Sequence, residues 1–315
     1  MPRAVSDVQH AAPIAIFTYR RAEHLRRTLE ALSRCELFEA SPLLVFADGA
    51  RGDSDASDVS AARRVATEML AGRAEFHFAD SNRGLASSVI AGVGEAIRRY
   101  GRVIVVEDDL EVSLMFLRYM NEALDRYADC TSVYQVSGHM FDVPGLRGCG
   151  SAMFLPFTTS WGWATWRRAW DQFDPAAPGW EQLASDRALR KRFNLGGVYD
   201  YAGMLERQMN GIGDSWAVRW NWTVFSHDGL ALFPAETLVR NSGLDGSGTH
   251  GRGWLRRFGG GQTRLWSHPV ALPEQVVEDH EAFVRVREAI WRQNGGALGR
   301  LADIAKPMLG RFGLR

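Results

Sequence analysis

Apolar runs alternate with amphipathic helical patterns throughout residues 13–106. The runs have the length of buried strands and cover residues 13–19, 43–47, 75–78 and 102–106. Between them, apolar residues recur at helical spacing over residues 22–34, 57–70 and 84–100. Strands and helices in this order form a parallel sheet with helices on both faces. The sequence therefore predicts an α/β fold with a mostly parallel central sheet.

Three consecutive acids, Glu107, Asp108 and Asp109, directly follow the last of these apolar runs. Neighbouring like charges repel one another, and desolvating them at the end of a buried strand is costly. A divalent cation removes this conflict, and hard oxygen ligands suit Mg²⁺ or Mn²⁺ holding a diphosphate. The alternative is a polar strand end whose aspartates cap the next helix.

Polar residues also lie at the ends of the other predicted strands, namely residues 19–21, Asp48 and the pair Asn82-Arg83. Ligands of parallel sheets bind beyond the carboxyl ends of the strands, so these groups are expected to gather at one rim. Backbone N–H groups at the helix start after Asn82 could attract a phosphate, with Arg83 adding a charge-assisted contact. Asn82 could equally be a simple helix cap, and Asp48 could equally belong to an Asp-Gly turn.

The composition limits the class of function. Among 315 residues, Lys plus Arg and Asp plus Glu both number 37, so the formal net charge is zero, which argues against a nucleic-acid-binding protein. Cys35, Cys130 and Cys149 form no CxxC pair, so neither zinc nor a disulfide framework is expected and a reducing cytoplasm fits. We find no apolar segment near the ~18 residues that span a bilayer and no signal-peptide core.

The second half of the chain is less regular. Strands are predicted at residues 133–136 and 155–159, and helices at 181–193, 200–209, 214–225 and 274–292. Residues 238–254 are rich in glycine and polar side chains and are predicted to form a mobile loop.

Several segments resemble one known family. The stretch VIVVEDDLEVSLMFLRYM resembles the metal motif of GT-A glycosyltransferases, and it is closest to the N-acetylglucosaminyltransferase I type. IFTYRRAEHLRRTLEAL and VFADGARG resemble the donor-nucleotide segments of that family. WGWATWRRAW looks like a hallmark of bacterial family 2-like enzymes that build surface polysaccharides. The likeness covers residues 13–120 and returns as short islands around residues 210–250.

The resemblance implies a GT-A (Rossmann-like) domain over residues 13–295. Residues 13–112 would form its nucleotide-donor half, and residues 113–295 a mixed acceptor half joined to it by one continuous sheet. Residues 1–12 would be an N-terminal tail and residues 296–315 a basic C-terminal tail. That tail either lies on an anionic membrane surface, where lipid-linked acceptors reside, or packs on the domain.

The resemblance also assigns roles at the rim. Asp109 would be the direct ligand of Mn²⁺ or Mg²⁺, Asp108 would contact the ribose or sugar, and Glu107 would contact the donor sugar. Asp48 would accept a hydrogen bond from the uracil N3–H. The remaining donor contacts would come from Thr18, from Arg83 and from one of Arg20 and Arg21, between which the alignment does not choose.

Asp214 is the candidate catalytic base. It lies in a segment that resembles the Asp-x-Trp island of the related transferases, although Ser215 stands where the transferase I type has a second acid. An inverting transferase needs a carboxylate to take the proton of the attacking acceptor hydroxyl. Asp214 could instead cap the helix that follows it, and Glu206 is then the alternative base.

Two further features of the second half bear on substrate binding. Residues 243–251 stand where the relatives carry a loop that closes over the donor, so His250 could reach the metal or diphosphate, with Asp245 a weaker candidate. Indole faces stack on sugar rings, so Trp161 and Trp216 are expected near the site, whereas most of the eleven tryptophans are expected in the core.

The sequence thus predicts a metal-dependent inverting glycosyltransferase. It would transfer a sugar, GlcNAc by the resemblance, from a UDP-sugar to a glycan or lipid-linked acceptor in surface polysaccharide synthesis. One rival is an NDP-sugar nucleotidyltransferase, which would carry a glycine-rich loop after the first strand, where residues 18–22 contain no glycine. The other rival is a non-catalytic nucleotide- or sugar-binding protein on the same fold.

Overall fold

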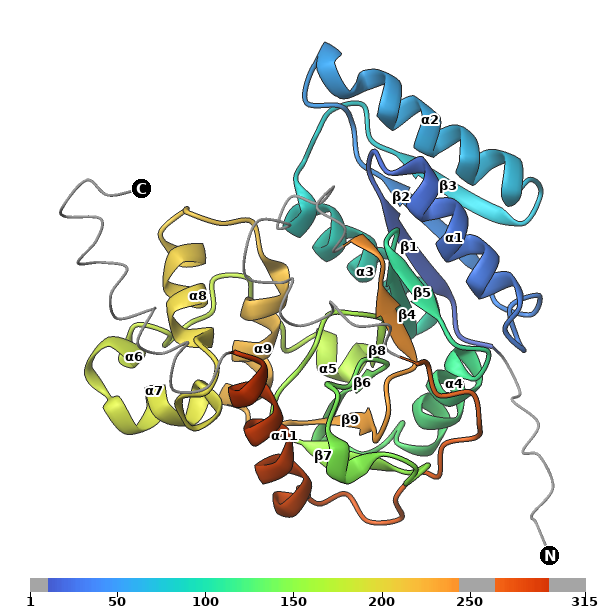
Figure 1. Cartoon of the computed structure of the whole chain (residues 1–315). Helices are drawn as coiled ribbons and strands as arrows, with labels where there is room; N and C mark the ends of the chain where they lie inside the picture. Colours follow the sequence, from blue (N-terminus) through green and yellow to red (C-terminus); the bar gives the residue numbers. More distant parts are fainter. Residues whose placement is uncertain (1–10, 244–263, 295–315) are drawn as a thin grey trace, which may run out of the picture.

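The computed structural model describes residues 11–243 and 264–294. An eight-stranded sheet forms its centre, in the order β3-β2-β1-β4-β8-β6-β9-β7 (Figure 1). The bounds of its strands are β1 (Ile14–Thr18), β2 (Leu43–Ala47), β3 (Ala74–Phe78), β4 (Arg102–Glu107), β6 (Val133–Ser137), β7 (Ala152–Leu155), β8 (Trp163–Trp166) and β9 (Leu230–Pro234).

The direction of the strands confirms the predicted mostly parallel sheet. The first four strands in the order pair in parallel, as do β6 and β9. Only β8, between β4 and β6, and β7, at the edge, run against the rest. Strands from both halves of the chain thus belong to one continuous sheet, and the carboxyl ends of its six parallel strands share a rim.

Helices cover both faces of this sheet, as predicted. They are α1 (Ala22–Ser33), α2 (Asp53–Met69), α3 (Leu85–Tyr100), α4 (Phe116–Arg126), α5 (Arg167–Trp170), α6 (Gln182–Ser185), α7 (Arg187–Phe193), α8 (Tyr201–Met209), α9 (Trp216–Ser226) and α11 (His280–Gln293). Within the described ranges we find no helix both long and apolar enough to cross a membrane.

The alternation of side chains along β1 explains the two layers. Ile14 and Ile16 point into a core shared with α1, α2 and α4, whereas Ala15 and Phe17 point into a second core shared with α3 and α9. Figure 1 shows α1 and α2 together on one side of the first strands and α3 on the other. A third core, between β7, β9, α8 and α11, supports the second half.

A small second sheet brings distant segments together at the rim. β5 (Leu110–Val112) directly follows the acidic triplet and pairs antiparallel with β10 (Val239–Asn241). The sequence indicated neither strand. The pairing places residues 241–243 directly beside Asp109, whose backbone oxygen accepts a hydrogen bond from the Ser242 amide at 2.8 Å.

Several predicted elements of the second half were wrong in extent. The strand predicted at residues 155–159 ends at Leu155, and the next residues form a loop that contributes to the site. The helix predicted at 181–193 is divided into α6 and α7 because the Asp186 carboxylate caps the amides of Ala188 and Leu189. The last helix begins at His280, after the capping Asp279, rather than at residue 274.

Candidate active site

The three acids at the end of β4 occupy three different environments. Asp108 is buried, and its carboxylate accepts hydrogen bonds from the Thr18 hydroxyl at 2.8 Å and from the Tyr19 amide at 3.1 Å. Its backbone oxygen accepts a third bond from the Thr28 hydroxyl at 2.8 Å. Asp108 therefore ties the end of β4 to the end of β1 through Thr18 and to the middle of α1 through Thr28.

Asp109 lies at the surface of the rim. Its carboxylate pairs with the Arg21 guanidinium at 2.8 Å, and each side chain is 18% exposed. A Cβ atom on Gly243 would overlap both of these side chains, so any other residue at position 243 would displace them. Arg20, in contrast, is exposed and lies 5.8 Å from the centre of the Tyr19 ring. Of the two candidate arginines, Arg21 is the one that contacts the triplet.

The acidic triplet carries more negative charge than its surroundings neutralise. Burial, and then the charges of Asp109 and Asp108, raise the pKa of Glu107 to about 8. Burial and the Asp109 charge raise the pKa of Asp108 to about 6, and burial also raises the pKa of Asp109 against the opposing effect of Arg21. A cation at this strand end would relieve the repulsion.

The triplet fits a divalent metal through Asp109. Its oxygens are hard donors, and a cation would replace the Arg21 guanidinium and the Asn241 amide that contact them at 2.8 and 3.4 Å. The Asp108 carboxylate is more deeply buried and is bound by Thr18 and Tyr19. Residues 11–243 and 264–294 hold no group of three or more His, Cys, Asp or Glu side chains arranged as a metal cage. Mg²⁺ and similar ions commonly bind through one or two carboxylates plus substrate phosphates and water, which is the arrangement that Asp109 suits.

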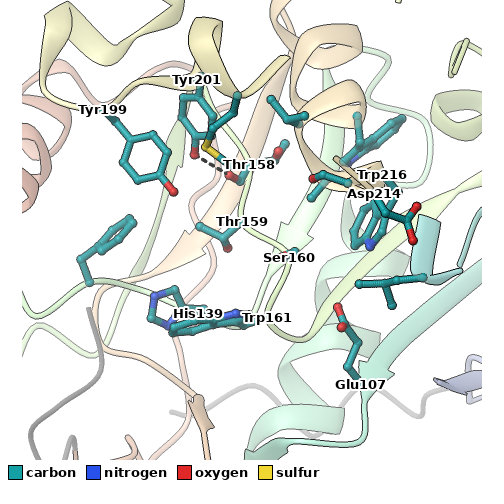
Figure 2. A pocket seen from close by; sticks show the side chains of 17 residues that line it. Glu107, His139, Thr158, Thr159, Ser160, Trp161, Tyr199, Tyr201, Asp214 and Trp216 are labelled. Carbon is teal, nitrogen blue, oxygen red and sulfur yellow. Dashed lines mark hydrogen bonds between the residues drawn. The ribbon is translucent and has the colours of Figure 1, made fainter. Parts of the chain in front are cut away.

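Glu107 faces a cavity of about 400 Å³ on the other side of the rim. Asp214, Trp161 and Trp216 line the same cavity, so the structure brings together four residues that the sequence singled out. In Figure 2, Glu107 and Asp214 lie on one side of the cavity and the tyrosines Tyr199 and Tyr201 on the opposite side. A cavity of this size, with few polar groups among aromatic walls, is typical of a small-molecule site.

Asp214 caps a different helix from the one expected. Its carboxylate accepts a hydrogen bond from the Ala86 amide of α3 at 3.2 Å, and a Cβ atom on Gly84 would lie 2.7 Å from it. The helix that follows Asp214, α9, has Ser215 at its N-cap position, and no side chain caps it. The positive end of the α3 dipole thus holds the Asp214 carboxylate at the cavity wall.

The alternative base is placed elsewhere. Glu206 forms an ion pair with Arg190, and it is not among the described residues that line the cavity. A carboxylate engaged by an arginine and remote from the cavity is poorly placed to take a proton from a substrate held there. The geometry therefore favours Asp214.

The Asp48 carboxylate accepts four hydrogen bonds within the protein. The donors are the amides of Gly49, Arg83 and Gly84 and the side-chain amide of Asn82, at 2.8–3.0 Å. These bonds use the acceptor sites of a carboxylate, so a uracil N3–H would have to displace one of them. They also engage the amides of Arg83 and Gly84, so a phosphate at the start of α3 would have to take the place of Asp48.

Arg83 and Asp48 line a second cavity, of about 510 Å³, between α3 and the ends of β2 and β3. The structure thus divides the sequence-predicted residues among three places. Arg21 and Asp109 lie at the rim surface, Glu107 and Asp214 in the first cavity, and Asp48 and Arg83 in the second. His250, Asp245 and the tail of residues 296–315 lie outside the described residues.

The two predicted tryptophans differ in their surroundings. Trp216 is 2% exposed and stacks on Trp163, with ring centres 4.9 Å apart, so it belongs to the core as well as to the cavity wall. Trp161 is only partly buried and packs against the His139 ring at 4.5 Å. Figure 2 shows His139 and Trp161 side by side on the wall away from Asp214. Trp161 is therefore the more accessible indole.

Several cavity residues were missed by sequence reasoning, namely His139, Phe141, Thr159, Tyr199, Tyr201 and Met204. They come from the loops after β6 and β7 and from the region of α8. No motif or spacing relates these segments, because the sheet and the third core bring them together. A lone histidine after a predicted strand was the only available signal.

His139 is expected to make the protein sensitive to acid. Burial lowers the pKa of this imidazole to about 3, so between about 3 and 6.5 the unfolded chain takes up a proton that the folded protein refuses. The free energy of unfolding is therefore highest above about pH 6.5 and decreases as the pH falls, by about 2 kcal/mol at pH 5. Urea unfolding measures the free energy of unfolding at pH 7.5 and at pH 5. The decrease between the two pH values should be about 2 kcal/mol smaller in His139→Gln than in the wild type. An equal loss in both proteins would contradict this assignment.

Comparisons with known proteins show likenesses of fold. No family model matches the chain, and no curated protein matches it. A mannosyltransferase from Pyrobaculum calidifontis, solved with GDP-Man and Mn²⁺, is 15% identical over 72% of this chain and 77% of its own, at a TM-score of 0.39. GalNAc-T7, solved with UDP, GalNAc and Mn²⁺, is 10% identical over 71% of this chain and 42% of its own, at 0.43.

A cytidylyltransferase from Leptospira borgpetersenii serovar Hardjo-bovis is also similar, with 11% identity over 52% of this chain and 64% of its own, at a TM-score of 0.33. The similar structures thus include glycosyltransferases and a nucleotidyl-transferring enzyme. At these identities and scores the resemblance does not extend to substrates, and the assignment of a function rests on the residues of this chain.

Proposed function

We propose that this protein is a metal-dependent, inverting glycosyltransferase that uses a UDP-sugar and acts on a hydroxyl of a glycan or lipid-linked saccharide. One observation carries the proposal: the acidic end of β4 presents Asp109 to the rim surface and Glu107 to a cavity whose wall also holds Asp214. Donor diphosphate and acceptor hydroxyl would thus meet between a metal-binding carboxylate and a base. GlcNAc as the sugar and surface polysaccharide as the product belong to the proposal on the sequence resemblance alone.

Each carboxyl group has a distinct part in this reaction. Asp109 would hold the cation together with the donor phosphates, and a bound cation neutralises the diphosphate and stabilises the departing UDP. Asp108 holds the ends of β1 and β4 together by accepting a hydrogen bond from the Thr18 hydroxyl. Glu107 lines the cavity, where its carboxyl group would contact a hydroxyl of the donor sugar.

Asp214 takes the proton of the acceptor hydroxyl as the acceptor oxygen attacks the anomeric carbon. The new carbon–oxygen bond forms on the face opposite the leaving group, while the bond to the diphosphate oxygen breaks and UDP leaves with the electron pair. The Ala86 amide fixes the orientation of the Asp214 carboxylate. Placing base and acceptor in one cavity with mostly apolar walls also limits the access of water, which would otherwise hydrolyse the donor.

The two rival functions are less well supported. A nucleotidyltransferase would need a glycine-rich phosphate loop after β1, but here the Thr18 hydroxyl and the Tyr19 amide are bound to Asp108. A non-catalytic binding protein has no need of a carboxylate fixed at the wall of the ligand cavity, as Asp214 is.

Titration calorimetry with UDP tests the donor site. We expect UDP to bind in the presence of Mn²⁺ and to lose most of its affinity in EDTA or in Asp109→Asn, because the neutral amide is a poor ligand for a hard cation. The matched control is Asp125→Asn, which removes a surface carboxylate of α4 that pairs with Arg102. This variant should bind UDP like the wild type. UDP binding that is indifferent to both EDTA and Asp109→Asn would refute the metal-dependent site.

A further inference from the structure

The part of the Asp214 cavity that lies away from Glu107 is lined mostly by aromatic side chains (Figure 2), and we call it the aromatic end. Its walls are formed by His139, Phe141, Thr159, Trp161, Tyr199 and Tyr201. Figure 2 shows this compartment on the side away from Glu107, with Thr159 between the tyrosines and His139. The reaction proposed above uses Glu107 and Asp214 and leaves the aromatic end without a role.

We propose that the aromatic end is the acceptor subsite and that it takes a neutral sugar ring rather than a phosphorylated or carboxylated group. That the ligand of this subsite is the acceptor rests on the proposed function, whereas the chemical class of the ligand follows from the walls alone. Three properties of the walls carry it: their charge, their hydrogen-bonding atoms and their flat apolar faces.

The charge of the walls disfavours an anion. Among the described residues that line the cavity there is no lysine or arginine, and the acids present are Glu107 and Asp214. Burial keeps His139 uncharged, because it lowers the pKa of the imidazole to about 3. A phosphate or carboxylate entering the aromatic end would lose its hydration without meeting a positive charge, which is strongly unfavourable.

Two polar atoms are nevertheless available to a ligand that carries hydroxyl groups. The Thr159 hydroxyl is buried and has no hydrogen-bond partner in the protein, an uncommon state for a buried polar atom. The Thr237 hydroxyl lies 2.7 Å from the Val239 oxygen and 3.3 Å from Nδ1 of His139. With its hydrogen on the closer Val239 oxygen, Nδ1 of His139 is the donor in the second contact. Nε2 of His139 is therefore an acceptor.

A sugar ring matches this combination. Its vicinal hydroxyls can donate to His139 and exchange a hydrogen bond with Thr159, while its C–H face packs on an aromatic ring. Trp161 supplies that ring, because it is partly exposed and packs against the His139 ring, with the ring centres 4.5 Å apart. A purely apolar ligand would leave Thr159 unsatisfied, so the walls favour a neutral polyol.

The loop that carries Thr159 and Trp161 is held in place by hydrogen bonds from three neighbouring segments. The Asn221 side chain accepts hydrogen bonds from the backbone and the hydroxyl of Thr158, at 2.8 and 3.1 Å. The Gln135 side-chain amide donates to the backbone oxygen of Thr159 at 2.8 Å, and the Tyr201 hydroxyl donates to the backbone oxygen of Thr158 at 3.2 Å. Such support fixes the recognition groups before the ligand arrives and lowers the entropic cost of binding.

Saturation-transfer NMR on the full chain with UDP and Mn²⁺ tests the inference. The probes are methyl glucoside, methyl galactoside and methyl mannoside, against glucose 6-phosphate and glucuronate. We expect neutral glycosides to bind and the anionic sugars to bind far more weakly. Trp161→Ala should lower glycoside affinity at least about tenfold through loss of stacking, and the isosteric Thr159→Val about fivefold through loss of one hydrogen bond.

The matched controls are Trp291→Ala on the outer face of α11 and Thr67→Val on the outer face of α2, which should bind glycosides like the wild type. The inference is overturned if the anionic sugars bind better, if no neutral glycoside binds, or if Trp161→Ala and Thr159→Val both leave binding unchanged. UDP binding, measured on the same samples, separates the two proposals: its absence with glycoside binding intact would refute the donor site and leave the sugar subsite supported.

Discussion

Asp214→Asn is expected to lower kcat by about 10²–10⁴-fold, the usual contribution of a general base, while leaving the affinity for UDP unchanged. The amide cannot take the proton of the acceptor hydroxyl. Its carbonyl oxygen can still accept the hydrogen bond from the Ala86 amide, because asparagine caps helices about as well as aspartate does. The variant therefore removes the base and keeps the end of α3 in place. Single-turnover kinetics with the donor sugar found by screening, alongside UDP calorimetry, measures both quantities.

Two companion variants isolate the catalytic part of this loss. Asp186→Asn changes another aspartate that caps a helix, at the start of α7, and should leave kcat unchanged. Asp214→Ala removes both base and cap, so it should match Asp214→Asn in kcat and lose in addition about 1 kcal/mol of stability. Should Asp214→Asn retain wild-type turnover, Asp214 is a structural cap only, and the base must be sought in another group at the cavity.

The first half of the fold could be predicted because each strand there has one local signature. Residues of β1 are buried on both faces, with Ile16 in one core and Phe17 in the other, so the strand appears in sequence as an uninterrupted apolar run. The intervening helices repeat their apolar residues at helical spacing, and α1 and α3 begin within a residue of the predicted start. The acidic triplet could be placed in the same way, because it directly follows the uninterrupted apolar run of β4.

The second half could not be predicted equally well because its order is set by tertiary pairing. β8 lies in the middle of the sheet and runs against both neighbours, yet its sequence WATW is too short and too rich in indoles to indicate a strand. The capping of α3 by Asp214 joins residues 128 positions apart, and no spacing rule connects them. Three of the four hydrogen bonds that Asp48 accepts likewise depend on how the loop after β3 folds back on β2.

Trp163→Ala is expected to lower the free energy of unfolding by about 3–5 kcal/mol, the range for removal of a fully buried large aromatic side chain. Trp163 is 0% exposed, and its ring lies within 4.9–6.1 Å of the rings of Trp216, Trp170 and Trp220, measured between centres. Because β8 joins the two halves of the sheet, the void would weaken the core on which α9 and the Asp214 loop rest. The midpoint of urea unfolding, compared with the wild type at unchanged slope, measures the loss.

Trp163→Phe and Trp291→Ala define what this loss means. Phenylalanine keeps most of the aromatic contact, so Trp163→Phe should lose less than Trp163→Ala, whereas Trp291→Ala removes a side chain that is 37% exposed on α11 and should change stability by no more than about 0.5 kcal/mol. A loss below about 1 kcal/mol in Trp163→Ala would mean that the surrounding indoles collapse into the void. Because Trp216 lines the cavity and stacks on Trp163, Trp163→Ala should also weaken glycoside binding, so the same residue that stabilises the sheet shapes the wall beside the proposed base.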